Sequence, residues 1–131
     1  MKGIIAVNNL GYIGLNKSLP WPPNKEDFKH FKEKTLGGML IVGYNTYQTL
    51  PPLKGRIVLM DWKDKDMIHT IHPGTLEKID WCIGGKKTYE KYCHLFIELH
   101  ISHINDNTIG DTTFPDFRNL NPECKIFNYN F

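Results

Sequence analysis

Two adjacent carboxylates begin a run of residues with helical spacing in the segment SLPWPPNKEDFKHFK, residues 18–32. Glu26 and Asp27 are separated from a Trp-Pro-Pro sequence by two residues and precede two phenylalanines. Residues four apart on a helix lie nearly in line, so Asp27 shares the face of Phe31 and Glu26 the polar flank of His30. We therefore predict that Asp27 points inward and that Glu26 points toward solvent.

A carboxylate placed against aromatic rings loses hydration, which raises its pKa and suits it to handling protons. Asp27 has a second interpretation, as an acid of the first helical turn that the helix dipole stabilises. The segment taken alone favours the second interpretation, because acids are common in first turns.

The bulk composition is that of an ordinary globular domain of 131 residues, with 40% hydrophobic and 23% charged residues. A net charge of +2 is too small to indicate a nucleic acid or a membrane surface as partner. Neither a signal peptide nor the ~20 apolar residues of a membrane span is recognisable. Three cysteines without a CxxC pair argue against a disulfide framework. We expect one cytoplasmic domain over residues 1–131, with no nucleic-acid or membrane partner.

The histidines do not indicate a metal site, whereas one of the arginines suits the binding of a carboxylate. The six histidines show no metal-ligand grouping, and we expect no metal; His69 and His72 would point to opposite faces of a strand. Arginine is rare, since Arg56 and Arg118 are the only two among sixteen basic residues. The guanidinium of Arg56, at the end of a loop, suits bidentate recognition of a carboxylate, although a lysine would serve a generic surface role equally well.

Short apolar runs alternate with helical patterns along the chain. The expected strands contain GIIAV, MLIVG, RIVLM, WCIGG and LFIELHIS, and helices are expected at 25–35, 45–50 and 85–94. Asn45 or Thr46 is the expected N-cap of the second helix. Nearly continuous apolar strands separated by helices indicate one α/β domain with a largely parallel sheet that is covered on both faces.

The segment IGLNKSLPWPPNKEDFKHFKEKT resembles the dihydrofolate reductase family. In that family the inward acid of the first helix is followed by Phe four residues later and by Thr eight residues later, which are Asp27, Phe31 and Thr35 here. VGYNTYQTL, LKGR, IGGKKTY, HISHI and GDTTFPDF follow in the family's order, so the resemblance covers nearly the whole chain. It implies an α/β three-layer sandwich with a mostly parallel sheet of about seven strands, an antiparallel C-terminal strand and helices on both faces.

The resemblance implies reduction of 7,8-dihydrofolate to 5,6,7,8-tetrahydrofolate by hydride transfer from NADPH. Asp27 would bind the pterin through a bidentate charge-assisted contact and promote protonation of N5. Trp21, in the loop against the pterin, and Ser102, which supports the acid, complete the implied catalytic set. From its local sequence, Ser102 is about as well explained as a strand residue that faces solvent.

The resemblance also implies the two binding sites. Arg56 would bind the α-carboxylate of the substrate's glutamate tail, in a substrate site made of Ile4, Ala6, Asp27, Phe28, Phe31, Leu50, Leu53, Arg56, Ile83 and Tyr89. The cofactor site would be made of Ala6, Ile13, Gly14, Leu19, Gly43, Tyr44, Asn45, Thr46, Gly84, Gly85, Lys86, Lys87, Thr88 and Tyr89. Each apolar residue in these sets also fits a plain core position. Gly84-Gly85, where the family has a cis peptide bond, fits either phosphate binding before a helix or a simple tight turn.

Two residues depart from the family pattern at the cofactor site. Tyr44 stands where relatives commonly carry a basic residue against the 2′-phosphate of NADPH, and Asp61 stands near where they often have small hydroxyl residues. An acid repels a phosphate but accepts hydrogen bonds from an unphosphorylated ribose. NADPH is the expected cofactor with NADH as the alternative, and Lys63, Lys65 or Lys87 would supply the missing charge.

The chain is short after Pro115 compared with the family, and ECKIFNYNF provides a single strand. The sheet edge must then be protected or paired, so we expect a monomer, with a dimer through the edge strand as the alternative. Antifolates such as methotrexate or trimethoprim are expected to bind. Two other functions stay open: reduction of another heterocycle, as in the pyrimidine reductases of riboflavin synthesis, and a catalytically weak folate-binding or structural role.

Overall fold

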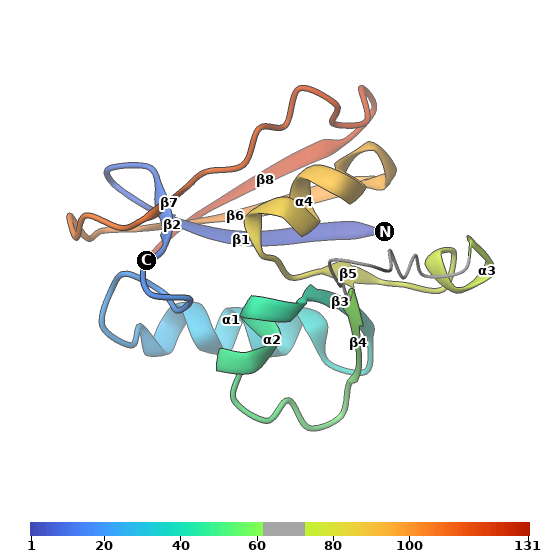
Figure 1. The fold of residues 1–131 in the computed structure, drawn as a ribbon, viewed down its shortest axis with the longest axis horizontal. Coiled ribbons are helices and arrows are strands. Elements are labelled where there is room, and N and C mark those ends of the chain that lie inside the picture. The colour runs from blue at the N-terminus through green and yellow to red at the C-terminus, as the bar shows by residue number, and fades with distance from the viewer. Residues whose placement is uncertain (62–72) are drawn as a thin grey trace, which may run out of the picture.

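A computed structural model describes residues 1–61 and 73–131, so Lys63, Lys65, His69 and His72 lie outside the described residues. Within that part of the chain, the central sheet has six strands in the order β4-β3-β5-β1-β6-β8 (Figure 1). Its strands are β1 (Lys2–Asn8), β3 (Met39–Gly43), β4 (Ile57–Asp61), β5 (Trp81–Cys82), β6 (Glu98–Ile104) and β8 (Lys125–Asn130). A separate two-stranded antiparallel sheet pairs β2 (Tyr12–Gly14) with β7 (Thr112–Thr113).

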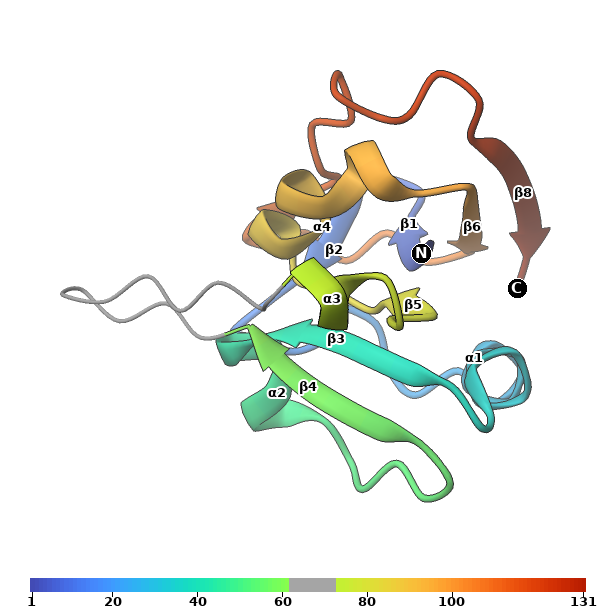
Figure 2. The same ribbon diagram turned by 90° about the vertical axis from the view of Figure 1, so that its right-hand side faces the viewer.

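Two apolar layers form because alternate residues of each buried strand point to opposite faces of the sheet. On β1, Ile4 packs in the layer that includes Phe31 of the first helix, whereas Ile5 packs in the layer that includes Tyr89. Leu40 and Ile41 of β3 divide in the same way. Figure 2 shows the result, with α1 on one side of the twisted sheet and α4 on the other. The predicted α/β architecture is confirmed.

Three helices follow the predicted ranges with small differences, and the short helix Pro73–Leu76 was not predicted. The helices are α1 (Lys25–Thr35), α2 (Tyr44–Thr49), α3 (Pro73–Leu76) and α4 (Lys86–Tyr92), followed by the 3₁₀ helix η1 (Cys93–Leu95). The predicted N-cap of α2 is wrong, because Asn45 and Thr46 lie inside the helix and Gly43 precedes it in an extended conformation. The cap of α1 is Asn24, whose side chain accepts a hydrogen bond from the backbone N–H of Asp27 at 3.0 Å.

The C-terminal strand differs from the prediction. β8 pairs in parallel with β6, in register from Glu98 opposite Lys125 to His103 opposite Asn130, so the predicted antiparallel direction is wrong. The predicted count of about seven strands is also too high for the described sheet, which has six. The cause is the long connection 105–124, which returns to the end of the sheet where β6 begins, whereas an antiparallel strand would follow a short hairpin loop.

The short strand β5 leaves a gap between its two neighbours in the sheet, β1 and β3. β5 lies between β1 and β3 but pairs with them only through Trp81 and Cys82. Beyond Cys82 the chain turns away toward α4, although β1 continues to Asn8 and β3 continues to Gly43. Ligands of open α/β sheets bind in such gaps outside the carboxyl ends of the strands. The sheet therefore provides a natural position for a site between α1 and α4.

Candidate active site

A cleft of about 1390 Å³ occupies this gap. It brings together Ile4, Ala6, Asp27, Phe28, Phe31, Leu50, Ile83 and Tyr89 of the predicted substrate set, together with Ser102. Its lining also includes every residue of the predicted cofactor set: Ala6, Ile13, Gly14, Leu19, Gly43, Tyr44, Asn45, Thr46, Gly84, Gly85, Lys86, Lys87, Thr88 and Tyr89. Pockets for one small ligand usually have about 300–1,000 Å³, so this cleft has room for more than one.

Asp27 is the carboxylate at the α1 end of the cleft. It is half-buried, whereas Glu26 beside it is exposed, so the predicted division of the two acids is confirmed. Burial raises the pKa of Asp27 above its ordinary value of 3.8, although a hydrogen bond from Ser102 and the nearby His30 imidazole lower it. A carboxyl group whose pKa is raised holds its proton more readily at the pH of a cell, which suits general acid chemistry.

Ser102 and Trp21 lie in different surroundings. Ser102, in the middle of β6, is only 2% exposed and lines the cleft, so its interpretation as a solvent-facing residue is wrong. Trp21 is buried but lines a second, more open hollow of about 620 Å³ that also includes Glu26 and Asp106. The structure therefore brings Ser102 to Asp27 and does not bring Trp21 to the wall of the main cleft.

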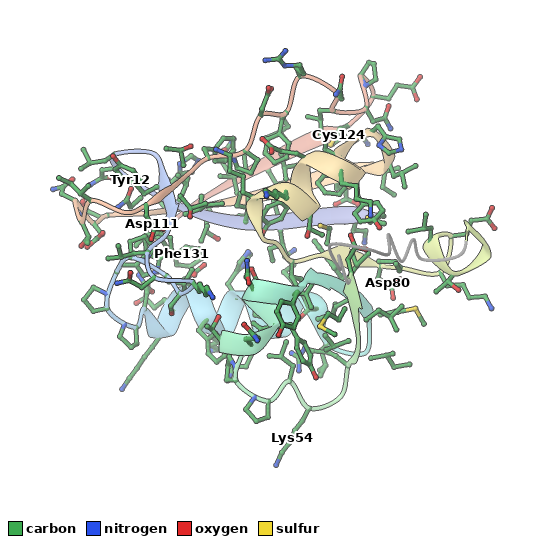
Figure 3. All side chains as sticks on the ribbon, viewed as in Figure 1. Tyr12, Lys54, Asp80, Asp111, Cys124 and Phe131 are labelled. Carbon is green, nitrogen blue, oxygen red and sulfur yellow. The ribbon has the colours of Figure 1, made fainter. Side chains whose placement is uncertain are left out.

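A group of aromatic rings and histidines that the sequence interpretation missed packs behind Asp27. His30 of α1 packs with its ring tilted against Tyr129 of β8, with ring centroids 4.2 Å apart, and against Phe131, which is labelled in Figure 3. The Nδ1 atom of His100 forms a hydrogen bond with the hydroxyl of Tyr129 at 2.8 Å. Burial lowers the pKa of His30 more than the negative charge of Asp27 raises it. The only sequence signal was the position of His30 three residues after Asp27.

Arg56 is held by the protein itself. Its Nε donates a hydrogen bond to the hydroxyl of Thr35 at 2.9 Å, and its other two nitrogens donate to the backbone carbonyls of Lys32 and Lys54. These contacts tie the end of α1 to the loop before β4. Neither Arg56 nor Leu53, both predicted substrate-site residues, lines the cleft.

Two turns face each other at the other end of the cleft, one after β3 and one after β5. Gly43 donates its backbone N–H to the carbonyl of Gly84 at 2.6 Å, and the peptide bond between Gly84 and Gly85 is cis. A Cβ atom at Gly43 would lie 2.6 Å from the hydroxyl oxygen of Thr88, and one at Gly85 would lie 2.9 Å from that of Thr46. A Cβ at either position would force a threonine side chain to move or the two turns to separate, so the close approach of the turns favours glycine at both.

The middle of the cleft is fixed by Tyr89, whose hydroxyl donates a hydrogen bond to the backbone carbonyl of Ile4. This carbonyl belongs to the part of β1 that β5 leaves behind, and a buried carbonyl without a partner would be costly. Burial raises the pKa of Tyr89 well above its ordinary value, so the phenol keeps the proton that makes this bond.

An ion pair that was not predicted lies at the outer end of the cleft. Asp61, the last residue of β4, accepts hydrogen bonds from the ammonium of Lys91 on α4 at 3.1 and 3.4 Å. Both residues line the cleft. Asp61 had been singled out in the sequence but Lys91 had not, because the two are 30 positions apart and no local pattern connects them.

Two negative findings concern the described ranges, 1–61 and 73–131. In them, no cluster of three or more His, Cys, Asp or Glu side chains is arranged to hold a metal ion. No helix among these residues has the length and apolar character needed to cross a membrane.

Comparisons with known proteins identify several relatives. The sequence model of the family described as dihydrofolate reductase matches residues 1–124. The dihydrofolate reductase of Buchnera aphidicola subsp. Schizaphis graminum is 30% identical over 139 residues, covering 95% of this chain and 81% of the relative. The dihydrofolate reductase type 9 of Escherichia coli is also 30% identical, over 83% of this chain and 72% of its own length.

One solved structure has a similar fold. It is described as the dihydrofolate reductase from Enterococcus faecalis complexed with NADP(H) and RAB-propyl, and it matches with a TM-score of 0.72. The match covers 89% of this chain and 77% of the other, at 24% identity. At this level of identity the similarity is evidence about the fold.

Proposed function

This chain belongs to the dihydrofolate reductase family, and we propose that the residues gathered in the cleft carry out the family's reaction. The protein is an NADPH-dependent oxidoreductase that reduces 7,8-dihydrofolate to 5,6,7,8-tetrahydrofolate. The observation that supports the assignment of its residues is the raised pKa of Asp27, an inward carboxyl group beside the apolar rings of α1.

Asp27 binds the pterin in this proposal and favours a proton at N5. An acceptor of two hydrogen bonds suits the 2-amino group and the adjacent ring nitrogen of a pterin. The hydroxyl of Ser102 holds the carboxylate from β6, and Phe28 and Phe31 provide the apolar walls of the slot, with ring centroids 6.2 Å apart. Trp21 stays a predicted catalytic residue that would reach the pterin only if its loop moved from its present hollow.

The other end of the cleft fits a dinucleotide. The two turns at Gly43 and Gly84 offer backbone close to the cleft, and Lys87 adds an exposed cation on the same wall. Ala6, Ile13 and Leu19 would contact the nicotinamide, next to the pterin slot. Bound NADPH supplies the hydride, while the residues of this chain orient the two rings and exclude water.

The family assignment favours this reaction over the reduction of another heterocycle and over a purely binding or structural role. Antifolates such as methotrexate and trimethoprim should compete with dihydrofolate for the slot at Asp27. The single domain over 1–131, the monomeric state, the cytoplasmic location and the contact of Arg56 with the glutamate tail stay predictions.

The first test follows absorbance at 340 nm for the purified protein with dihydrofolate, and with NADPH or NADH in parallel. We expect NADPH oxidation that depends on dihydrofolate and is blocked by methotrexate. Binding of methotrexate without any turnover would instead support the binding role, and binding of neither folate nor antifolate would support a different heterocycle as substrate.

A further inference from the structure

The outer end of the cleft contains two opposite charges whose roles toward a cofactor differ. An acid at the end of a strand next to the phosphate-binding turn characteristically accepts hydrogen bonds from the ribose of NAD, and it repels the 2′-phosphate of NADP. Asp61 has this position, because it ends β4 and lies opposite Gly43, the residue that precedes α2. From Asp61 alone, the site would be expected to prefer the unphosphorylated cofactor.

The contact of Lys91 with Asp61 argues against a preference for the unphosphorylated cofactor. Its ammonium contacts both carboxylate oxygens of Asp61, so the charge of the acid is compensated and each oxygen already accepts one hydrogen bond. The exposed fractions decide which of the two charges meets a ligand, since the side chain of Asp61 is 8% exposed and that of Lys91 is 41% exposed. The surface that the pair presents to the cleft is therefore cationic.

The surroundings of Lys91 keep it positively charged. Burial alone would lower its pKa, but hydrogen bonds to Asp61 and Tyr92 and the charge of Asp61 raise it on balance. The ammonium also lies 5.1 Å from the ring centroid of Tyr92, a favourable position for a cation. Another cation of the same helix, Lys86, is turned toward β7, where it donates a hydrogen bond to Thr113 at 2.7 Å.

We infer that Lys91, held in place by Asp61, is the residue that selects NADPH over NADH by binding the 2′-phosphate of the cofactor. This inference rests on the proposed function, because it concerns the cofactor of the same cleft. In it, Asp61 is a positioning residue for the cation, and the pair takes over the role of the basic residue that Tyr44 does not provide. The inference differs from the sequence-based expectation, which assigned this charge to Lys63, Lys65 or Lys87.

The test measures cofactor binding directly, apart from turnover. Dissociation constants for NADPH and NADH are obtained from the quenching of tryptophan fluorescence in the wild type and in Lys91→Gln. The fragments adenosine 2′,5′-bisphosphate and adenosine 5′-monophosphate are titrated in parallel, since they differ only in the 2′-phosphate. We expect Lys91→Gln to weaken the two 2′-phosphorylated ligands by about tenfold or more, the scale of a hydrogen bond to a charged group, with little change for the others.

Lys87→Gln is the matched control, since it removes the same charge one turn earlier on α4 and from the same cleft. It should weaken NADPH and NADH alike and leave the ratio of their dissociation constants unchanged. Lys91→Arg should keep the preference for NADPH. An unchanged ratio in Lys91→Gln, or an equal change of the ratio in Lys87→Gln, would overturn the inference.

A loss of folding in Lys91→Gln is the foreseeable complication, because it leaves Asp61 with an uncompensated charge. The double variant Asp61→Asn/Lys91→Gln removes both charges and should fold, yet still bind NADPH no better than NADH. If it retains the wild-type preference, the inference is wrong. The proposed function is tested separately by dihydrofolate turnover of the wild type, so either can fail without the other.

Discussion

Two carboxylates at opposite ends of one cleft have different partners. Asp27, at the α1 end, is half-buried next to phenylalanines, and its hydrogen-bond partner is the neutral hydroxyl of Ser102. Asp61, at the outer end, is more deeply buried, with 8% of its side chain exposed, but both its oxygens contact the ammonium of Lys91. The described contacts of the two acids therefore differ in kind, an ammonium for Asp61 and a hydroxyl with a nearby imidazole for Asp27.

Burial alone therefore does not make a carboxyl group a proton donor. Desolvation favours the protonated form unless an opposite charge offsets it. Removing one partner of a buried pair leaves an uncompensated charge, so the Asp61–Lys91 pair is suited to presenting a fixed charge to a ligand. Asp27 meets the hydroxyl of Ser102 and the imidazole of His30, whose own pKa is lowered by burial, and its pKa stays raised on balance. Asp27 is therefore the group whose proton is available for chemistry.

The strongest test of this comparison is Asp27→Asn. We expect it to retain the fold and part of the folate binding but to lose turnover at neutral pH by about 10²–10⁴-fold, the usual contribution of general acid catalysis. The measurement is the steady-state rate with dihydrofolate and NADPH. Glu26→Gln, a change of the exposed acid next to it, should have little effect. Equal losses in the two variants would refute the assignment of the inward face to Asp27.

Gly43→Ala tests the other end of the cleft. The important feature there is the close contact between two backbone turns, and not the pKa of an ionisable group. The new Cβ would meet the hydroxyl of Thr88 at 2.6 Å, so either Thr88 must rotate or the two turns must separate. Overpacking of this kind costs about 1–3 kcal/mol, and we expect NADPH affinity to fall by about tenfold, measured by fluorescence titration. Dihydrofolate binding should change less.

The double variant Gly43→Ala/Thr88→Ala is the control for this steric explanation, because it removes the hydroxyl that the new Cβ would meet. It should recover thermal stability relative to Gly43→Ala, which is the readout here because Thr88 itself belongs to the predicted cofactor set. If the second change gives no recovery, the close approach of the two turns is not the reason for the glycine.

The variant Arg56→Lys tests whether substrate binding at the α1 end of the cleft also depends on a fixed cation. We expect a rise of about tenfold in the KM for dihydrofolate, because a point charge replaces the bidentate fork. Thermal stability should fall slightly, because the bond to Thr35 and the bonds to two carbonyls are disturbed. Arg118→Lys is the control, since that side chain is 78% exposed and does not line the cleft. An unchanged KM would leave Arg56 with only its structural role.

The comparison also shows what could be predicted from the sequence. The inward position of Asp27 followed from helical spacing, and the two glycine turns followed from motifs that are continuous in the chain. The Asp61–Lys91 pair could not be predicted, because it depends on how β4 and α4 meet in space. The direction of β8 was missed for a related reason, since it depends on the path of the connection 105–124 and not on the strand's own residues.

The smallest predicted effect concerns the stability of the wild type and Asp27→Asn as a function of pH. Because the pKa of Asp27 is raised in the folded protein, its proton binds more tightly there than in the unfolded chain, where the pKa is near 3.8. The resulting stabilisation is complete below pH 3.8 and is lost as the pH rises through the folded pKa. Asparagine stays neutral, so Asp27→Asn should become more stable than the wild type as the pH rises, by a modest amount because Asp27 is partly exposed.

Thermal melts of the wild type, Asp27→Asn and Glu26→Gln across this pH range measure that difference. The Tm advantage of Asp27→Asn should be larger at pH 7 than at pH 4, and Glu26→Gln should not show it. A wild type that becomes more stable relative to Asp27→Asn as the pH rises would mean that the charged carboxylate is compensated in the fold. Asp27 would then resemble Asp61, and the contrast between the two ends of the cleft would be lost.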